Sequence, residues 1–248
     1  MPLRETEAIV FRTYRLGEAD KIVSLFSRQL GRIRAVAGGA QRPKSRYGGV
    51  LEPLTYIRVW LFERENRDLA RLNSAELVES FFAMQSDYAV QLAAQYVAEA
   101  SERLLPEREV NERAFRLLLS VLRGLKAGGP VDPPLLYFNY WLLRLGGFLP
   151  EFDRCAGCGC PIENQPASYD ASSHRIACSR CGSAPDAFRL PAGAVALLEQ
   201  LRRLPLARWE PTPEQTSTVQ TARRVFEALV ELHADKKLIT RELMAQEM

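Results

Sequence analysis

Short runs of alternating apolar and polar residues fill the first 80 positions of the chain. Five of these runs are rich in β-branched residues: 7–14, 21–27, 31–37, about 54–62 and about 68–78. Turn-forming residues separate the first three runs, and a longer break over 38–53 precedes the fourth. Such spacing is typical of small antiparallel barrels and sandwiches. The pattern predicts a five-stranded N-terminal β unit, with a five-stranded lid on a helical part as the alternative.

After position 85 the apolar residues recur at steps of three and four, which is the period of an amphipathic helix. The predicted helices share this period and cover residues 86–105, 111–125, 132–146, 192–204 and 213–232. Asp132 is expected to cap the third helix, with Pro133 in its first turn. That helix is apolar around its whole circumference, so we expect it at the centre of the core.

These elements predict an α+β chain of two domains. A β domain over residues 1–80 precedes a helical domain over 81–248, which holds an insert at about 152–184. The chain has 248 residues, 47% of them hydrophobic, which is enough to bury cores of this size. Its start is polar and acidic, unlike a signal peptide. Its most apolar segment, 133–143, is far shorter than the roughly 20 residues that cross a bilayer. We therefore expect a cytoplasmic protein that does not enter a membrane.

The net charge of +3 is unevenly distributed. Residues 1–80 hold 14 basic and 10 acidic side chains, whereas residues 81–248 hold 19 and 20. The basic excess therefore lies at the N-terminal end. Such an asymmetry indicates an acidic polymer as partner.

All five cysteines lie between positions 155 and 181, unlike the spread-out cysteines of a secreted disulfide framework. Two C-x2-C pairs, Cys155 with Cys158 and Cys178 with Cys181, are separated by 19 residues. This spacing is typical of four-cysteine zinc sites, in which four sulfurs leave no vacant position on the ion. The pattern predicts a structural Zn²⁺ site at these four residues.

A redox C-x-x-C motif is the competing interpretation of these pairs. That chemistry needs a single pair at the start of a helix, and it leaves the second pair unexplained. Cys160 is expected to be a bystander, and His174 is expected to be a surface residue that could in principle replace a cysteine.

A basic stretch without acidic residues runs from position 28 to position 46. Its six cations are Arg28, Arg32, Arg34, Arg42, Lys44 and Arg46. In the strand 31–37 the period of two places Arg32 and Arg34 on one face and Ile33 on the other. The residues from 38 to 49 are then a flexible basic loop that can follow a phosphate backbone, with Tyr47 available for base stacking. A solvated loop whose charge aids solubility is the alternative.

Several short blocks, in this order, resemble the RecO family of recombination mediator proteins. The blocks are Gly17-Glu-Ala-Asp20, Gly31-Arg-Ile-Arg34, Ala37-Gly-Gly-Ala40 with its basic tail to Arg46, Leu51-Glu-Pro-Leu54, residues 142–150 directly before Cys155, and residues 237–243. Together they cover nearly the whole chain. Their order and spacing together are specific.

The resemblance implies an N-terminal OB-fold barrel, a helical domain and a four-cysteine zinc finger. The implied activity is binding of single-stranded and double-stranded DNA and annealing of complementary strands. It also implies help in loading RecA onto DNA coated by the single-stranded-DNA-binding protein. The implied partners are RecR and the acidic C-terminal tail of the single-stranded-DNA-binding protein, and the implied location is the nucleoid. Some members of the family lack the cysteines, which favours a structural role for the zinc.

Annealing requires no bond chemistry, and the sequence contains no P-loop, no nucleotide-binding glycine motif and no nucleophile elbow. Only His174 and His233 are available for histidine-based acid–base chemistry. We therefore do not expect an enzyme. A zinc-dependent enzyme would need an open coordination position, which four cysteines do not leave. A zinc-ribbon module that binds RNA or joins other proteins is the remaining alternative.

Overall fold

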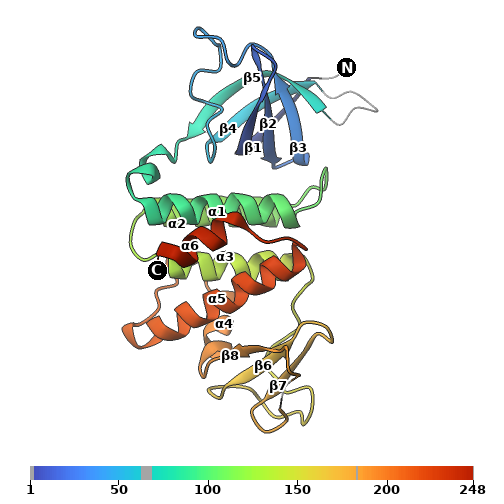
Figure 1. Ribbon diagram of the computed structural model, residues 1–248, viewed down its shortest axis with the longest axis vertical. Helices are drawn as coiled ribbons and strands as arrows, with labels where there is room; N and C mark the ends of the chain where they lie inside the picture. Colours follow the sequence, from blue (N-terminus) through green and yellow to red (C-terminus); the bar gives the residue numbers. More distant parts are fainter. Residues whose placement is uncertain (1–2, 63–68, 183, 248) are drawn as a thin grey trace. The chain divides into compact units, whose positions relative to one another are not determined.

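The computed structural model describes residues 3–62, 69–182 and 184–247 of the chain. By its contacts the chain divides into two compact units, Met1–Lys126 and Ala127–Met248 (Figure 1). The first unit contains a β-barrel together with the first two helices. The domain boundary near residue 80 stays a prediction, since the division by contacts falls after Lys126. Within the described ranges, no helix is long and apolar enough to cross a membrane.

Five strands form a closed barrel in the order β1-β2-β3-β5-β4. Their bounds are β1 Leu3–Leu16, β2 Asp20–Ser27, β3 Gly31–Ala37, β4 Tyr56–Phe62 and β5 Leu69–Glu79. The five predicted strands are confirmed, although β1 begins earlier than expected and Asp68, the expected start of the fifth, lies outside the described residues. The barrel is not purely antiparallel as predicted, because β3 and β5 pair in parallel to close it. This closure follows from the crossover that places β5 between β3 and β4.

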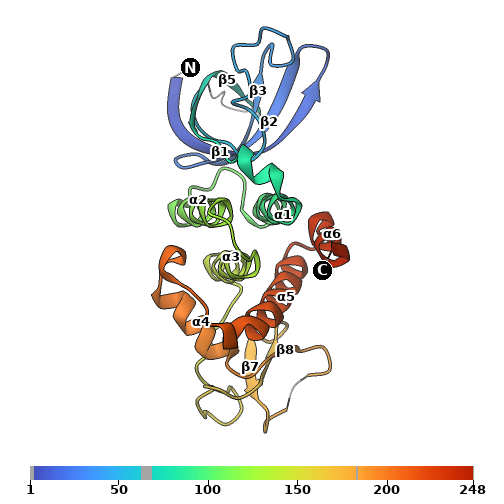
Figure 2. The ribbon, with the colours of Figure 1, turned by 90° about the vertical axis from the view of Figure 1, so that its left-hand side faces the viewer.

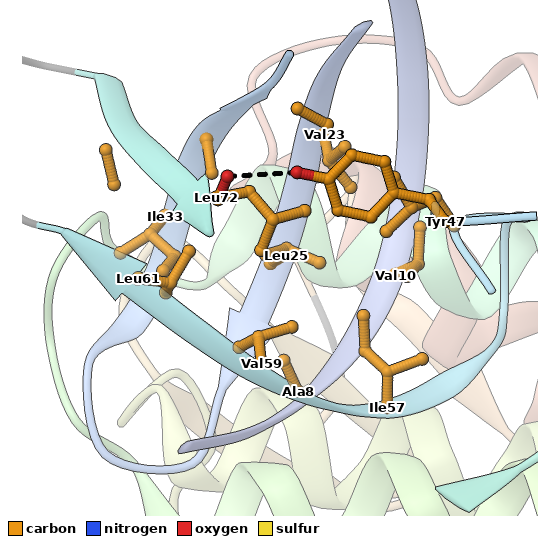
Figure 3. Close-up of a cluster of buried hydrophobic side chains, with 14 of the residues drawn as sticks. Ala8, Val10, Val23, Leu25, Ile33, Tyr47, Ile57, Val59, Leu61 and Leu72 are labelled. Atoms are coloured by element: carbon orange, nitrogen blue, oxygen red, sulfur yellow. Dashed lines mark hydrogen bonds between the residues drawn. The ribbon is translucent and has the colours of Figure 1, made fainter. Parts of the chain in front are cut away.

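Alternation along the strands fills the interior of the barrel with aliphatic side chains (Figure 3). Val10, Leu25, Ile57 and Leu61 are among the interior residues that are fully buried. In β3 the exposed Arg34 lies between the buried Ile33 and Ala35, so the predicted separation of charged and buried faces is confirmed.

The helices α1 (Tyr88–Leu104) and α2 (Glu112–Lys126) follow a 3-10 turn at Phe82–Ser86. Figure 2 shows them nearly end-on, side by side against the barrel. The Asp87 side chain caps α1 by accepting a hydrogen bond from the Val90 amide, and α1 ends before Pro106. Phe115 of α2 packs against Phe26 and Tyr56 of the barrel, with ring centroids 6.2 and 6.0 Å away. These contacts explain why the two helices belong to the barrel's unit.

The second unit contains four α-helices among its described residues: α3 Asp132–Leu145, α4 Ala194–Arg203, α5 Thr216–His233 and α6 Ile239–Glu247. Three short strands, β6 Ala167–Asp170, β7 Arg175–Cys178 and β8 Phe188–Leu190, form a separate sheet in the order β7-β6-β8. The apolar α3 is buried as predicted and packs chiefly on α5. The helix α6 was not predicted as an element of its own.

The predicted capping role of Asp132 is wrong. Val131 occupies the N-cap position of α3, and in the described part of the chain its side chain makes no capping hydrogen bond. The Asp132 carboxylate instead lies 2.7 Å from the guanidinium of Arg223 on α5, which is itself buried and 2.6 Å from Glu227. Asp132 therefore helps to neutralise a buried arginine between α3 and α5. Its position at the start of a predicted helix does not reveal this role.

Candidate nucleic-acid interface and metal centre

The basic loop that follows β3 is held against the turn between β1 and β2. Gln41 donates from its side-chain amide to the carbonyl of Asp20 at 2.6 Å and to that of Gly17 at 3.3 Å. The Gly39 amide donates to the Asp20 carboxylate at 2.8 Å. Successive backbone hydrogen bonds arrange the loop as a chain of turns, and its predicted flexibility stays a prediction. We call the turn 17–19 together with the loop 38–55 the loop end of the barrel.

Three predicted DNA-binding residues, Arg42, Lys44 and Arg46, lie on the loop end with exposed side chains. Within residues 3–62, 69–182 and 184–247, none of the three has a carboxylate within ion-pair distance. Arg46 donates to the Tyr47 hydroxyl at 3.0 Å and lies over its ring at 5.0 Å. The loop end is therefore a positively charged surface on a fixed backbone, which is suited to phosphate groups.

Tyr47 is not available for base stacking, so that prediction is wrong. Its side chain is 2% exposed and lies in the barrel core beside Val10 and Val23 (Figure 3). Its hydroxyl donates to the carbonyl of Leu72 at 3.0 Å. Tyr47 therefore anchors the loop to the barrel, because it buries its ring while satisfying its polar atom.

The other three predicted residues, Arg28, Arg32 and Arg34, lie near the opposite end of β3. Arg28 contacts Glu7 and Glu112, each at 2.7 Å. Its guanidinium holds the pKa of Glu112 below the usual value by hydrogen bonding.

Arg32 and Arg34 lie 3.1 and 3.7 Å from Glu107, and Arg32 also donates to the carbonyl of Leu105 at 3.0 Å. The stretch 28–46 contains no acidic residue of its own, but glutamates from other segments contact the arginines of its first half. These contacts link the barrel to the helices α1 and α2 and to the segment between them.

The strand pairing reveals a further row of residues on the outer face of the barrel. Tyr14, Ile22, Val36 and Arg71 lie opposite one another across β1, β2, β3 and β5. Directly paired residues share a face of the sheet, and the neighbouring Val23 points into the core. Tyr14 is 47% exposed. We call these four residues the outer row.

The outer row offers an exposed aromatic ring at one end and a cation at the other on one barrel face, which suits a base and a phosphate of a nucleic-acid strand. Sequence reasoning missed it because Arg71 lies on a distant strand and only the register places it in the same row as Tyr14. The sequence signal that was available is Tyr14 itself, an aromatic residue at the end of the predicted run 7–14.

The cysteines gather at one end of the β6–β7 hairpin in the second unit. The sulfurs of Cys155, Cys158, Cys160 and Cys178 all lie within 4.8 Å of one another. Cys155 accepts hydrogen bonds from the amides of Cys178 at 3.3 Å and Gly157 at 3.4 Å. These backbone bonds, that from Cys178 foremost, lower the pKa of Cys155 to about 6. The donor set, thiols with backbone N–H support, fits a zinc ion.

Cys181, which the spacing predicts as the fourth ligand, lies outside this close group, while Cys160, the expected bystander, belongs to it. Cys181 still interacts with Cys155, Cys158 and Cys178, and hydrogen bonding to Cys158 raises its pKa to about 12. His174 is exposed, and its Nδ1 lies 3.3 Å from the Tyr169 hydroxyl rather than in the cluster. The ligand set predicted from spacing thus stays a prediction.

Two models of one protein family together match nearly the whole chain. Residues 1–81 match the model described as "Recombination protein O N terminal", and residues 85–242 match "Recombination protein O C terminal". The chain belongs to the RecO family. A protein named "DNA repair protein RecO" from Koribacter versatilis is 37% identical over 238 residues, covering 96% of each chain. A protein of the same name from Anaeromyxobacter sp. is 32% identical, and the match covers 95% of this chain and 93% of that protein. Another from Cutibacterium acnes is also 32% identical, and the match covers 98% of this chain and 99% of that protein.

We expect this RecO-family chain to bind one metal ion, zinc, through its thiolates. Replacing Cys155 with serine should weaken zinc binding by at least about tenfold, because Cys155 is buried at the centre of the cluster. Metal analysis after dialysis against a zinc buffer measures this effect. Ser179→Ala, in the second knuckle, is the matched control and should keep the full zinc content. A wild-type protein without metal, purified in the absence of chelator, would contradict the prediction.

Proposed function

We propose that this RecO-family chain anneals complementary DNA strands and helps RecA to load onto DNA coated by the single-stranded-DNA-binding protein, in recombinational DNA repair. The observation that carries the proposal is the loop end, where Arg42, Lys44 and Arg46 project from a fixed backbone. Phosphate contacts of this kind supply sequence-independent affinity for DNA. Sequence independence is required of a protein that must pair any two complementary strands.

An annealing protein must neutralise the charge of two strands and still let them slide until the bases match. The loop end offers exposed arginine and lysine side chains that bind phosphates without reading bases. The outer row adds Tyr14, on which a base can stack regardless of its identity. Neither surface forms or breaks a covalent bond, so the proposed activity is not enzymatic. It requires no nucleotide.

The proposed partners follow from family membership. RecR and the acidic C-terminal tail of the single-stranded-DNA-binding protein are the expected protein partners, with RecA acting on the product at the nucleoid in the cytoplasm. The zinc centre is proposed to hold the β6–β7 hairpin in shape, since four thiolates leave no position for a reacting group. An RNA-binding or adaptor role is less well supported, because the whole chain matches proteins named for DNA repair.

Tyr14 and Tyr47 provide a contrast that tests the assignment of the aromatic contact. Tyr14→Ala should lower the affinity for single-stranded DNA by about tenfold, since one base–ring stack contributes about 1–3 kcal/mol. Tyr47→Phe should leave DNA affinity unchanged and lower stability by about 1 kcal/mol, because it removes the hydrogen bond to Leu72. Fluorescence anisotropy with an oligonucleotide and thermal unfolding measure the two effects. Unchanged DNA affinity in Tyr14→Ala would contradict the stacking role of Tyr14, whereas Tyr47→Phe keeps its ring and tests only the hydrogen bond to Leu72.

The annealing of complementary oligonucleotides, precoated with the single-stranded-DNA-binding protein and without nucleotide, tests the proposed function. A fluorophore and a quencher on the two strands report pairing. The protein should speed pairing well above the rate of the coated strands alone. Binding of DNA without such acceleration would reduce the proposal to DNA binding alone.

A further inference from the structure

The second unit brings five sulfur atoms to a centre at which zinc binds four. Cys155, Cys158 and Cys178 belong to both possible ligand sets. The close group adds Cys160, whose sulfur lies within 4.8 Å of these three. The spacing of the second knuckle adds Cys181, whose thiol interacts with the same three. Cys160 and Cys181 therefore compete for the fourth coordination position of the ion.

Cys160 is placed beside the other sulfurs by the backbone of the first knuckle. The Cys155 amide donates to the carbonyl of Cys160 at 2.9 Å, and the Gly159 amide donates to the carbonyl of Cys155 at 2.9 Å. Gly159 has a φ of +71°, a left-handed conformation that turns the chain back toward Cys155. The position of Cys160 is therefore part of the knuckle's own hydrogen-bonded structure.

Cys181 approaches the same centre from the second knuckle. Its amide donates to the carbonyl of Cys178 at 3.1 Å. Its sulfur lies only 3.0 Å from the point that a Cβ on Gly157 would occupy, and the Cys155 sulfur lies 3.7 Å from that point. A side chain at position 157 would thus crowd Cys181, and the glycine leaves it room to lie next to Cys155.

We infer that Cys160 and Cys181 are interchangeable fourth ligands of a metal centre whose three constant ligands are Cys155, Cys158 and Cys178. The inference rests on the proposed zinc centre and is independent of DNA binding. The exchange is a substitution at the ion: one sulfur–metal bond forms as the other breaks, and the displaced thiolate takes a proton from water or stays charged. No electrons are transferred.

Arg180 lies in the second knuckle between Cys178 and Cys181. It interacts with the Cys160 sulfur, and this interaction raises the pKa of Arg180. A displaced Cys160 therefore stays next to a positive charge, close to the metal. The centre should consequently keep its ion when a thiol-reactive electrophile blocks one of the two residues.

Cobalt substitution of the full-length protein tests the exchange, because the sulfur-to-cobalt charge-transfer absorption reports how many thiolates bind the ion. Cys160→Ser and Cys181→Ser should each bind one Co²⁺ with undiminished absorption. The double variant should lose about a quarter of the absorption, since one of four sulfurs is then missing. A loss of that size in either single variant would overturn the inference, because it would show that only one of the two residues serves as fourth ligand.

Alkylation of the zinc-loaded wild-type chain gives a second readout that does not depend on any variant. We expect one thiol per chain to react readily with iodoacetamide, with the label divided between Cys160 and Cys181, and the zinc to remain bound. Peptide mass spectrometry locates the label. A label confined to one of the two residues would overturn the inference, whereas a wild-type chain without metal would instead refute the zinc centre itself.

Discussion

Reversing the three exposed cations of the loop end, as Arg42→Glu, Lys44→Glu and Arg46→Glu together, should lower the affinity for single-stranded DNA about 100-fold at about 0.1 M salt. The magnitude follows from counterion release, in which each phosphate contact on a single strand contributes about 0.7 to the slope of log K against log salt. Three contacts give a slope of roughly 2, and hence about two decades of affinity at this salt concentration. Titrations by anisotropy at several salt concentrations measure both quantities.

The control for this variant reverses three exposed arginines on the helices of the same unit. Arg103, Arg113 and Arg116 lie on α1 and α2 with exposed side chains, so the net charge changes by the same amount. Affinity should change much less in the control, and the salt slope should stay close to that of the wild type. Equal losses in the two variants would assign the effect to overall charge, and an unchanged loop variant would move the DNA site elsewhere.

Gly31→Ala should destabilise the protein by about 3–5 kcal/mol, which is a large part of the stability of an ordinary domain. Gly31 begins β3 with a φ of +68°, and a Cβ there would lie 2.2 Å from the carbonyl oxygen of Glu109. The neighbouring Arg108 amide donates to the carbonyl of Arg32 at 2.9 Å, so the segment cannot move away without losing a hydrogen bond. The melting temperature, followed by circular dichroism, should fall by about 10 °C.

Gly17→Ala is the control that separates the steric clash expected in Gly31→Ala from the strain of a left-handed backbone. Gly17 has a φ of +60°, and a Cβ there would meet no atom within 4 Å. This variant should therefore cost only about 1 kcal/mol, the usual penalty for a left-handed residue with a side chain. If the two variants are equally stable, the close approach of the segment around Glu109 to β3 is not present in solution.

The strands and most helices could be predicted because their signals are local. The period-two alternation in 31–37 places Arg34 and Ile33 on opposite faces of the strand. Pro106 marks where α1 must end. The parallel pairing of β3 with β5 could not be predicted in this way. It depends on which distant strand closes the barrel, and no property of either strand alone specifies that partner.

The candidate interface was only half predictable for a related reason. Arg28 and Arg42 have the same charge and lie in the same acid-free stretch, yet Arg28 contacts Glu112 from a helix more than 80 positions away, whereas Arg42 remains exposed. Tyr47 is buried because the barrel has room for its ring and Leu72 offers a carbonyl. The clustering of Cys155, Cys158 and Cys178 was predictable from the spacing of the two knuckles, whereas the presence of Cys160 in the close group was not.

Annealing of DNA strands coated with the single-stranded-DNA-binding protein, measured for the wild type, the loop-end triple variant and the helix triple variant, tests the proposed role of the loop end directly. We expect rapid pairing by the wild type and the helix variant, and a rate near background for the loop-end variant. Pairing by the loop-end variant at the wild-type rate would contradict this role.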